Sequence, residues 1–134
     1  MIIDSQTAQI GFWGGASVLF AFLISHAIAD FALQGKFIAI CKERGGNYTE
    51  FFGDSPPKLL WVHILTAHSL IHAGGVWLVS GSVVLGFAEF VLHWAIDYAK
   101  SGGLTTFHVD QFLHYGCKLG FVFILVWAPE IAFP

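Results

Sequence analysis

The sequence predicts an all-α protein, a four-helix transmembrane bundle whose helices run alternately up and down. Of its 134 residues, 56% are apolar and 11% are charged, whereas a soluble domain devotes about a quarter of its residues to Asp, Glu, Lys and Arg. The mean hydropathy is +0.70. No Lys, Arg, Asp or Glu lies between Asp4 and Asp30 or between Lys58 and Glu89. Both runs exceed the roughly 20 apolar residues that a spanning helix needs.

The whole chain, 1–134, is expected to form a single integral membrane domain. The apolar stretches predict four spanning helices, in order over 10–32, 59–79, 83–99 and 109–128. Ser80, Gly81 and Ser82 separate the second helix from the third, and Pro129 ends the fourth, because proline cannot continue a helix. The connections are short except for one, which is typical of antiparallel neighbours in a bundle.

The one long connection is the loop 35–57, which carries charged residues and the breakers Gly45, Gly46, Pro56 and Pro57. Its first part, 36–44, mixes basic residues with Phe and Ile. We predict that this part forms a short interfacial helix that extends the first span. A solvated loop with an apolar anchor is the alternative.

All six basic residues fall on one side of the predicted bundle. They lie in the loop 35–57 or directly after it at Lys58, in the connection 100–108 and in the first half of the fourth helix. The positive-inside rule therefore predicts a multi-pass protein of a bacterial inner membrane with a cytoplasmic long loop and both termini outside. The net charge of −3 argues against a nucleic-acid partner. Membrane lipid is the expected partner, because basic loops attract anionic head groups.

Each predicted span carries two ionisable residues four positions apart, which places both side chains on one face of the helix. The pairs are His26/Asp30, His68/His72, His93/Asp97 and Asp110/His114. In an alternating bundle all four pairs fall in the cytoplasmic half of the membrane. Residues 26–31 also resemble residues 93–98, which is consistent with a duplicated two-helix hairpin.

A divalent metal ion is the explanation that we favour for these eight donors. Ionisable side chains inside a bilayer are costly unless they are paired or ligated. Imidazoles and carboxylates without thiolates suit Zn²⁺ first, with Mn²⁺ or Fe²⁺ as alternatives. The donors suffice for one saturated ion or for two ions with open positions. Two other interpretations stay open: polar contacts that only hold the helices together, and a metal-free path for protons or ions.

Further polar residues are expected to support these donors or to act on a substrate. The candidates for hydrogen bonds to the donors are Gln34, Gln111, Lys100 and Lys118. Asp110 and Glu89 are candidates for a general base, and Lys100 for a contact with an anionic head group. For Glu89, a satisfied polar contact is an equal alternative.

Three histidines depart from the pattern. His72 lies roughly 19 Å along its helix from Leu59 at 1.5 Å per residue. We therefore expect it to be a deep ligand, a residue behind the ligands or a proton relay, not a level partner of the other pairs. His63 points about 140° away from His68 and is expected at the interface, and His108 in the solvated connection.

Four motifs occur in order along the chain. They are His26-x-x-x-Asp30-Phe31-x-x-Gln34, His68-x-x-x-His72, His93-x-x-x-Asp97-x-x-Lys100 and Asp110-Gln111-x-x-His114. With these motifs the chain resembles a family of small bacterial and phage membrane proteins that is catalogued as a domain of unknown function. The paired motifs are also similar to the intramembrane site of cation-diffusion zinc transporters, although those proteins have six spans.

Three functions follow from these features. The favoured one is a metal-dependent hydrolase of a lipid-like or amphiphilic substrate at the inner leaflet, because the donors outnumber those that one ion needs. The second is a divalent-cation or proton transporter or channel, for which a homo-oligomer would supply the polar path that the outer half of a monomer lacks. The third is a phage-type membrane scaffold, which has no need of buried donors.

Overall fold

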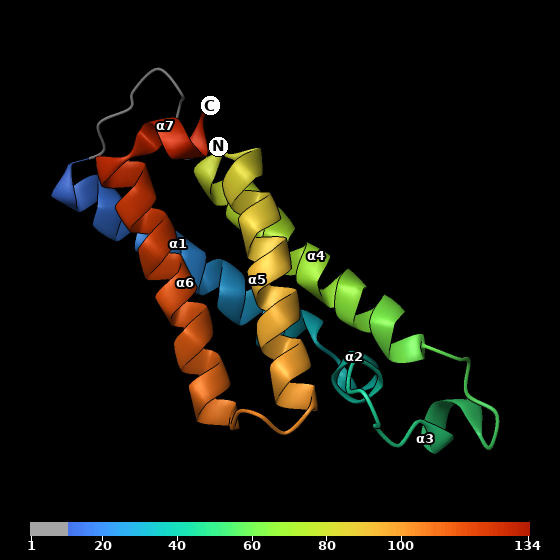
Figure 1. Ribbon diagram of the computed structural model, residues 1–134. Coiled ribbons are helices and arrows are strands. Elements are labelled where there is room, and N and C mark those ends of the chain that lie inside the picture. Colours follow the sequence, from blue (N-terminus) through green and yellow to red (C-terminus); the bar gives the residue numbers. More distant parts are fainter. Residues whose placement is uncertain (1–10) are drawn as a thin grey trace.

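The computed structural model describes residues 11–134, and every regular element in this range is a helix (Figure 1). The four long helices are α1 (Phe12–Ala27), α4 (Leu60–Ser80), α5 (Val83–Ser101) and α6 (Phe107–Trp127). The shorter elements are a π-helical turn, η1 (Ile28–Leu33), which continues α1, and the helices α2 (Lys36–Cys41), α3 (Thr49–Phe52) and α7 (Pro129–Ala132). The all-α prediction is confirmed for the described residues. Ile10, the first residue of the predicted span 10–32, and the N-terminus lie outside them.

The four long helices pack around one shared interior. Helix α1 contacts α4 and α6, and α5 contacts the same two helices. At one end, the turn between α4 and α5 meets α7, where Ser82 Oγ donates a hydrogen bond to the carbonyl oxygen of Ala132, 2.5 Å away. At the other end, Arg44 after α2 donates a hydrogen bond to the Tyr98 hydroxyl near the end of α5, at 2.6 Å. Helix α4 is inclined to α5 rather than parallel to it (Figure 1).

Three helical segments of the described residues are long and apolar enough to cross a membrane: Phe12–Leu33, Leu60–Ser80 and Phe107–Trp127. Helix α5 is not among them, since it carries Glu89, Asp97 and Lys100. Large apolar side chains cover the outer surface of the long helices, among them Phe20, Leu78, Phe87, Phe112 and Phe123. Such a continuous apolar exterior suits contact with hydrocarbon rather than with water.

Small residues let neighbouring helices approach closely, as is common in membrane bundles. A Cβ atom added at Gly86 of α5 would lie 3.0 Å from the Cβ of Trp77 and 3.2 Å from the carbonyl oxygen of Ala73. A Cβ atom at Gly75 of α4 would collide with the hydroxyl of Ser25 on α1. These contacts bring α4 close to both of its neighbours.

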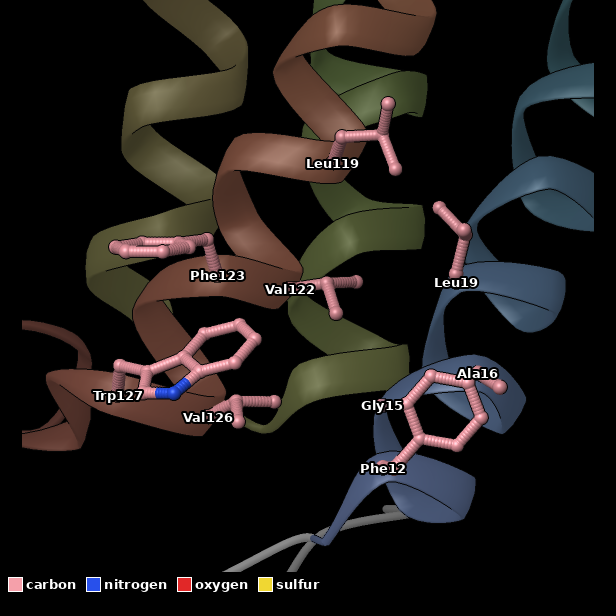
Figure 2. Close-up of a pocket in the computed structure, with 9 residues that line it drawn as sticks. All are labelled: Phe12, Gly15, Ala16, Leu19, Leu119, Val122, Phe123, Val126 and Trp127. Atoms are coloured by element: carbon pink, nitrogen blue, oxygen red, sulfur yellow. The ribbon is translucent and has the colours of Figure 1, made fainter.

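The interior is divided into an apolar and a polar part. The apolar core lies toward the α7 end and consists of Val18, Phe22, Val76, Leu85, Phe121, Leu125 and Ala132. The polar part follows one to two helical turns further along, toward α2, and holds buried histidines, carboxylates and lysines. A separate groove of about 690 Å³ opens between α1 and α6 at the α7 end, and apolar side chains line it (Figure 2).

The segment 36–44 differs from the predicted extension of the first span. It contains the short helix α2, but Gln34 (φ −80°, ψ 78°) and Gly35 (φ −66°, ψ 170°) leave the helical conformation and separate α2 from η1. Glycine favours such a break because it is a poor helix former. The segment is not a freely solvated loop either, since Cys41 and Lys42 are buried. Helix α3 within 35–57 was not predicted.

Candidate metal centre

Helix α1 and the π-helical turn η1 that continues it bring one histidine and one aspartate into the polar interior. Turns of this kind are rare and occur frequently at functional sites. His26 lies just before η1 and Asp30 within it, and His26 Nε2 is 3.2 Å from Asp30 Oδ2. Gln111 of α6 donates a hydrogen bond to the same oxygen at 3.0 Å. Asp30 is thereby held between α1 and α6.

Five histidine rings from four helices gather in the interior, and each is at most 2% exposed: His26, His68, His72, His93 and His114. The rings of His72 and His93 stack with centroids 3.7 Å apart, and those of His93 and His114 with centroids 4.1 Å apart. The ring centroid of His26 is 4.9 Å from that of His72 and 5.3 Å from that of His114. His93 therefore lies at the middle of the cluster.

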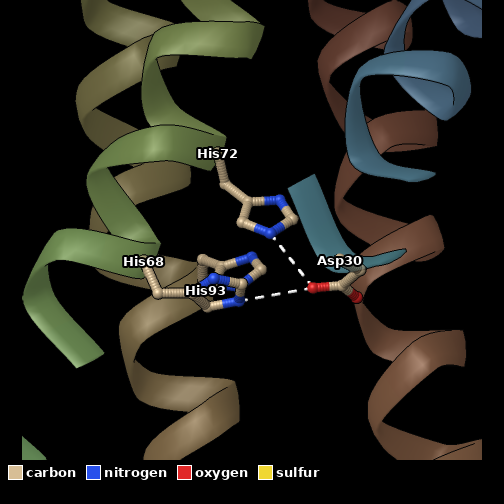
Figure 3. Close-up of side chains that lie close together, drawn as sticks. All are labelled: Asp30, His68, His72 and His93. Atoms are coloured by element: carbon tan, nitrogen blue, oxygen red, sulfur yellow. Dashed lines mark hydrogen bonds and ion pairs between the residues drawn. The ribbon is translucent and has the colours of Figure 1, made fainter. Parts of the chain in front are cut away.

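The first set of donors consists of Asp30, His68, His72 and His93 (Figure 3). Each residue offers one ligand atom, and these atoms lie within 4.8 Å of one another. Asp30 Oδ1 is 3.1 Å from His72 Nε2 and 3.3 Å from His68 Nε2. The side chain of Asp30 is 9% exposed, whereas the histidines are fully enclosed.

The second set consists of His93, Asp97 and His114, whose ligand atoms also lie within 4.8 Å of one another. Asp97 Oδ1 is 3.4 Å from His114 Nε2, and Asp97 Oδ2 is 3.7 Å from the Nε2 atoms of both His68 and His93. Asp110 stands beside this set, with Oδ1 3.7 Å from His114 Nε2. All eight predicted donors thus converge on one region, and His93 belongs to both sets.

Several imidazole nitrogens in this region have no hydrogen-bond partner among the described residues. They are Nδ1 of His26, both ring nitrogens of His68 and of His93, and Nε2 of His114. Buried polar atoms are normally hydrogen-bonded, so a group of such atoms beside two carboxylates needs a further partner. A divalent cation fits this donor set, because imidazole nitrogen and carboxylate oxygen are ligands that Zn²⁺ accepts.

Glu89 and Lys118 lie on the side of His93 that faces the apolar core. Lys118 Nζ is 2.5 Å from Glu89 Oε1, and the same oxygen is 3.4 Å from His93 Nδ1. Because Nδ1 faces Glu89, the other nitrogen of His93 faces Asp97. A carboxylate behind a histidine is the usual arrangement that orients a metal ligand. Glu89 therefore stands behind the donor sets and forms an ion pair there.

Lysines also lie at the end of the cluster that faces α2. Lys100 pairs with Asp110 at 3.2 Å and is 24% exposed. Lys42 pairs with Asp97 at 2.7 Å and is 6% exposed. The sequence predicts the first contact but not the second, because Lys42 lies outside every predicted span and belongs to no repeated pattern. Gln34 has a buried Oε1 without a hydrogen-bond partner in the described chain.

His63 and His108 are exposed and take no part in the cluster. The expectation that His108 lies in the connection was wrong, because it belongs to the first turn of α6. His72 joins the other donors rather than standing apart from them, since its ring stacks on that of His93 and both belong to the first donor set. Counting 1.5 Å per residue assumes that the helices are parallel, whereas α4 is inclined to α5 (Figure 1). Inclination reduces the distance that each residue of α4 covers along the bundle.

The fold and the cluster define a helical protein with apolar spans and a buried group of histidines and aspartates. The chain belongs to the family described as "Protein of unknown function (DUF3307)", whose model matches residues 18–132. The predicted membership of a family of unknown function is thus confirmed. The comparisons with curated proteins and with solved structures gave no match.

Proposed function

We propose that the protein is a membrane-embedded, metal-dependent hydrolase of a lipid-like or amphiphilic substrate. The observation that carries this proposal is the convergence of buried imidazole nitrogens without hydrogen-bond partners on the carboxylates of Asp30 and Asp97. Zinc is the first candidate for the ion, and manganese or iron the alternatives, since all three accept nitrogen and oxygen ligands. Such an ion would lower the pKa of a bound water to about 7 and polarise the bond to be cleaved.

We also propose that the protein has four spans in an up-down-up-down bundle, in which α5 spans the membrane together with the three more apolar segments. Its charges are compatible with a membrane because Glu89, Asp97 and Lys100 all pair inside the bundle. We further propose that the α2 end faces the cytoplasm of a bacterial inner membrane and that both termini lie outside, as the basic residues of that end favour.

Two residues at the rim of the cluster are suited to act on a substrate. Asp110 Oδ1 is buried and has no hydrogen-bond partner among the described residues, so it is free to accept a proton as a general base. Lys100 is the more exposed partner of Asp110 and is suited to hold an anionic head group that approaches from the lipid surface. Glu89 is the weaker candidate for the base, because Lys118 already neutralises it.

Transport of a divalent cation or of protons is the second candidate function. It requires a polar path from the cluster to the α7 end, and the apolar core of Val18, Phe22, Val76, Leu85, Phe121 and Leu125 lies in that direction. A scaffold role is the third candidate, and it does not explain why the histidines and carboxylates are buried together. The site at one end of the bundle therefore favours the hydrolase over both alternatives.

The first test is the metal content of protein purified in detergent without chelators. We expect a stoichiometric transition metal in the wild type and its loss in the His26→Ala/His93→Ala double variant. The matched control is His63→Ala/His108→Ala, which removes two exposed histidines and is expected to keep the metal. Less than about a tenth of an equivalent in the wild type would contradict a metal centre, and retention by the cluster variant would contradict its location.

A second measurement separates the hydrolase from the transporter. The zinc-loaded protein is reconstituted in vesicles of phosphatidylethanolamine and phosphatidylglycerol that enclose a zinc-sensitive dye. The hydrolase proposal expects lipid cleavage products by mass spectrometry that disappear with chelator, and no zinc entry above that of empty vesicles. Zinc entry that the His26→Ala/His93→Ala variant abolishes would replace the hydrolase with the transporter.

Orientation is tested at Ser55, an exposed residue between α3 and α4. A Ser55→Cys variant is expected to react with a membrane-impermeant maleimide only after cells are lysed. Native Cys41 is unsuited to this purpose, because its side chain is fully buried and burial raises the pKa of its thiol. Wild-type cells provide the background. Labelling of the Ser55→Cys variant in intact cells would invert the proposed topology.

A further inference from the structure

Lys42 brings a positive charge from outside the spans into the donor cluster. It caps the C-terminus of α2, and its ammonium group is 2.7 Å from Asp97 Oδ2. Two residues further on, Arg44 donates a hydrogen bond to Tyr98 at 2.6 Å and stacks over the ring of Tyr98, 4.9 Å from its centroid. Both contacts join the segment after α2 to the end of α5, so the position of Lys42 is well defined.

Lys42 contacts one of the two oxygens of Asp97, the carboxylate of the second donor set. Asp97 Oδ2 faces the Nε2 atoms of His68 and His93 at 3.7 Å each. It therefore lies between the first donor set and the second. An ammonium group bound to this oxygen and a divalent cation on the second set would be close neighbours of like charge, which is unfavourable in a buried site.

The charges of the interior lead to the same conclusion. The four carboxylates are Asp30, Glu89, Asp97 and Asp110, and the three lysines paired with carboxylates are Lys42, Lys100 and Lys118. With neutral imidazoles these groups leave a net charge of −1. One divalent ion changes it to +1, which a single bound anion neutralises, whereas two ions change it to +3. Buried charge of that size is strongly disfavoured without counterions.

We propose that Lys42 takes the place of a second metal ion, so that the centre binds one divalent cation on the first donor set, Asp30, His68, His72 and His93. This inference rests on the proposed metal centre. Lys42 is then a positioning residue that occupies Asp97 and determines how many ions the cluster accepts. Helix α2, although outside the spans, is thereby part of the centre.

The test is the zinc stoichiometry of the intact protein, equilibrated with zinc, desalted and measured by elemental analysis. We expect one equivalent per chain in the wild type and two in Lys42→Met, which keeps the length of the side chain and removes its charge. Lys36→Met is the matched control, because Lys36 is exposed and pairs only with Glu50 at 2.6 Å, and it is expected to keep one equivalent.

Asp97 provides a second arm. In the Lys42→Met background, Asp97→Asn is expected to return the stoichiometry from two equivalents to one. Two equivalents in the wild type, one equivalent in a folded Lys42→Met, or two equivalents in Lys42→Met/Asp97→Asn would each overturn the inference. Absence of zinc from the wild type would instead overturn the proposed function itself.

Discussion

The Asp30→Asn variant is expected to lose its divalent metal. Asp30 lies within 3.3 Å of nitrogen atoms of His26, His68 and His72, so it supplies the negative charge of the proposed binding set. The amide of asparagine keeps the size of the side chain but removes this charge. We expect zinc affinity to fall by more than about 100-fold, because loss of outer partners alone costs about 10- to 100-fold. Competition with a chromogenic zinc chelator in detergent measures the change.

Asp54→Asn is the matched control for this variant. Asp54 is an exposed acid of the long connection, and its substitution removes the same charge without touching the cluster. We expect its zinc affinity to equal that of the wild type. If Asp30→Asn binds zinc as tightly as Asp54→Asn does, the ion is not held at Asp30.

Removal of Lys118 is expected to have the largest effect on stability. Glu89 is 1% exposed, and Lys118 is its only cationic partner among the described residues. Lys118→Met leaves a buried carboxylate without a countercharge, which typically costs about 3–5 kcal/mol. We expect the free energy of unfolding in mixed micelles to fall by about this amount, as followed by far-UV circular dichroism.

A double variant separates the ion pair from the role of Glu89 behind His93. Lys118→Met/Glu89→Gln removes both charges and is expected to recover most of the lost stability. Its glutamine keeps a polar oxygen facing His93 Nδ1, so zinc affinity should stay near that of the wild type. Lys118→Met/Glu89→Leu is equally neutral but lacks this oxygen, and we expect about 10- to 100-fold weaker zinc binding. Equal affinities of the two double variants would show that Glu89 does not orient His93.

Much of the candidate site follows from helical periodicity. Residues four apart share one face of a helix, and costly polar pairs on apolar helices must face one another rather than lipid. Periodicity alone therefore predicts that His26, Asp30, His93 and Asp97 share one interior. The same reasoning predicts helices near the segments where α1, α4, α5 and α6 occur.

What the sequence did not reveal depends on tertiary geometry. Periodicity describes one helix at a time and carries no information on its inclination, so it did not predict that His72 of α4 packs against His93. Nor does it describe irregular segments, and the break at Gln34 and Gly35 determines where α2 carries Lys42. The basic and apolar residues of 36–44 indicated an interfacial helix, but nothing in that pattern distinguished Lys42 from Lys36.

The most direct measurement is anomalous diffraction at the zinc absorption edge from crystals of the zinc-loaded protein. We expect an anomalous peak inside the bundle, with nitrogen or oxygen atoms of Asp30, His68, His72 and His93 at about 2.0–2.2 Å from the ion. The ligands would then come from three of the four long helical segments. A structure with no such peak, or with these side chains turned toward the lipid, would contradict a shared metal centre in the interior.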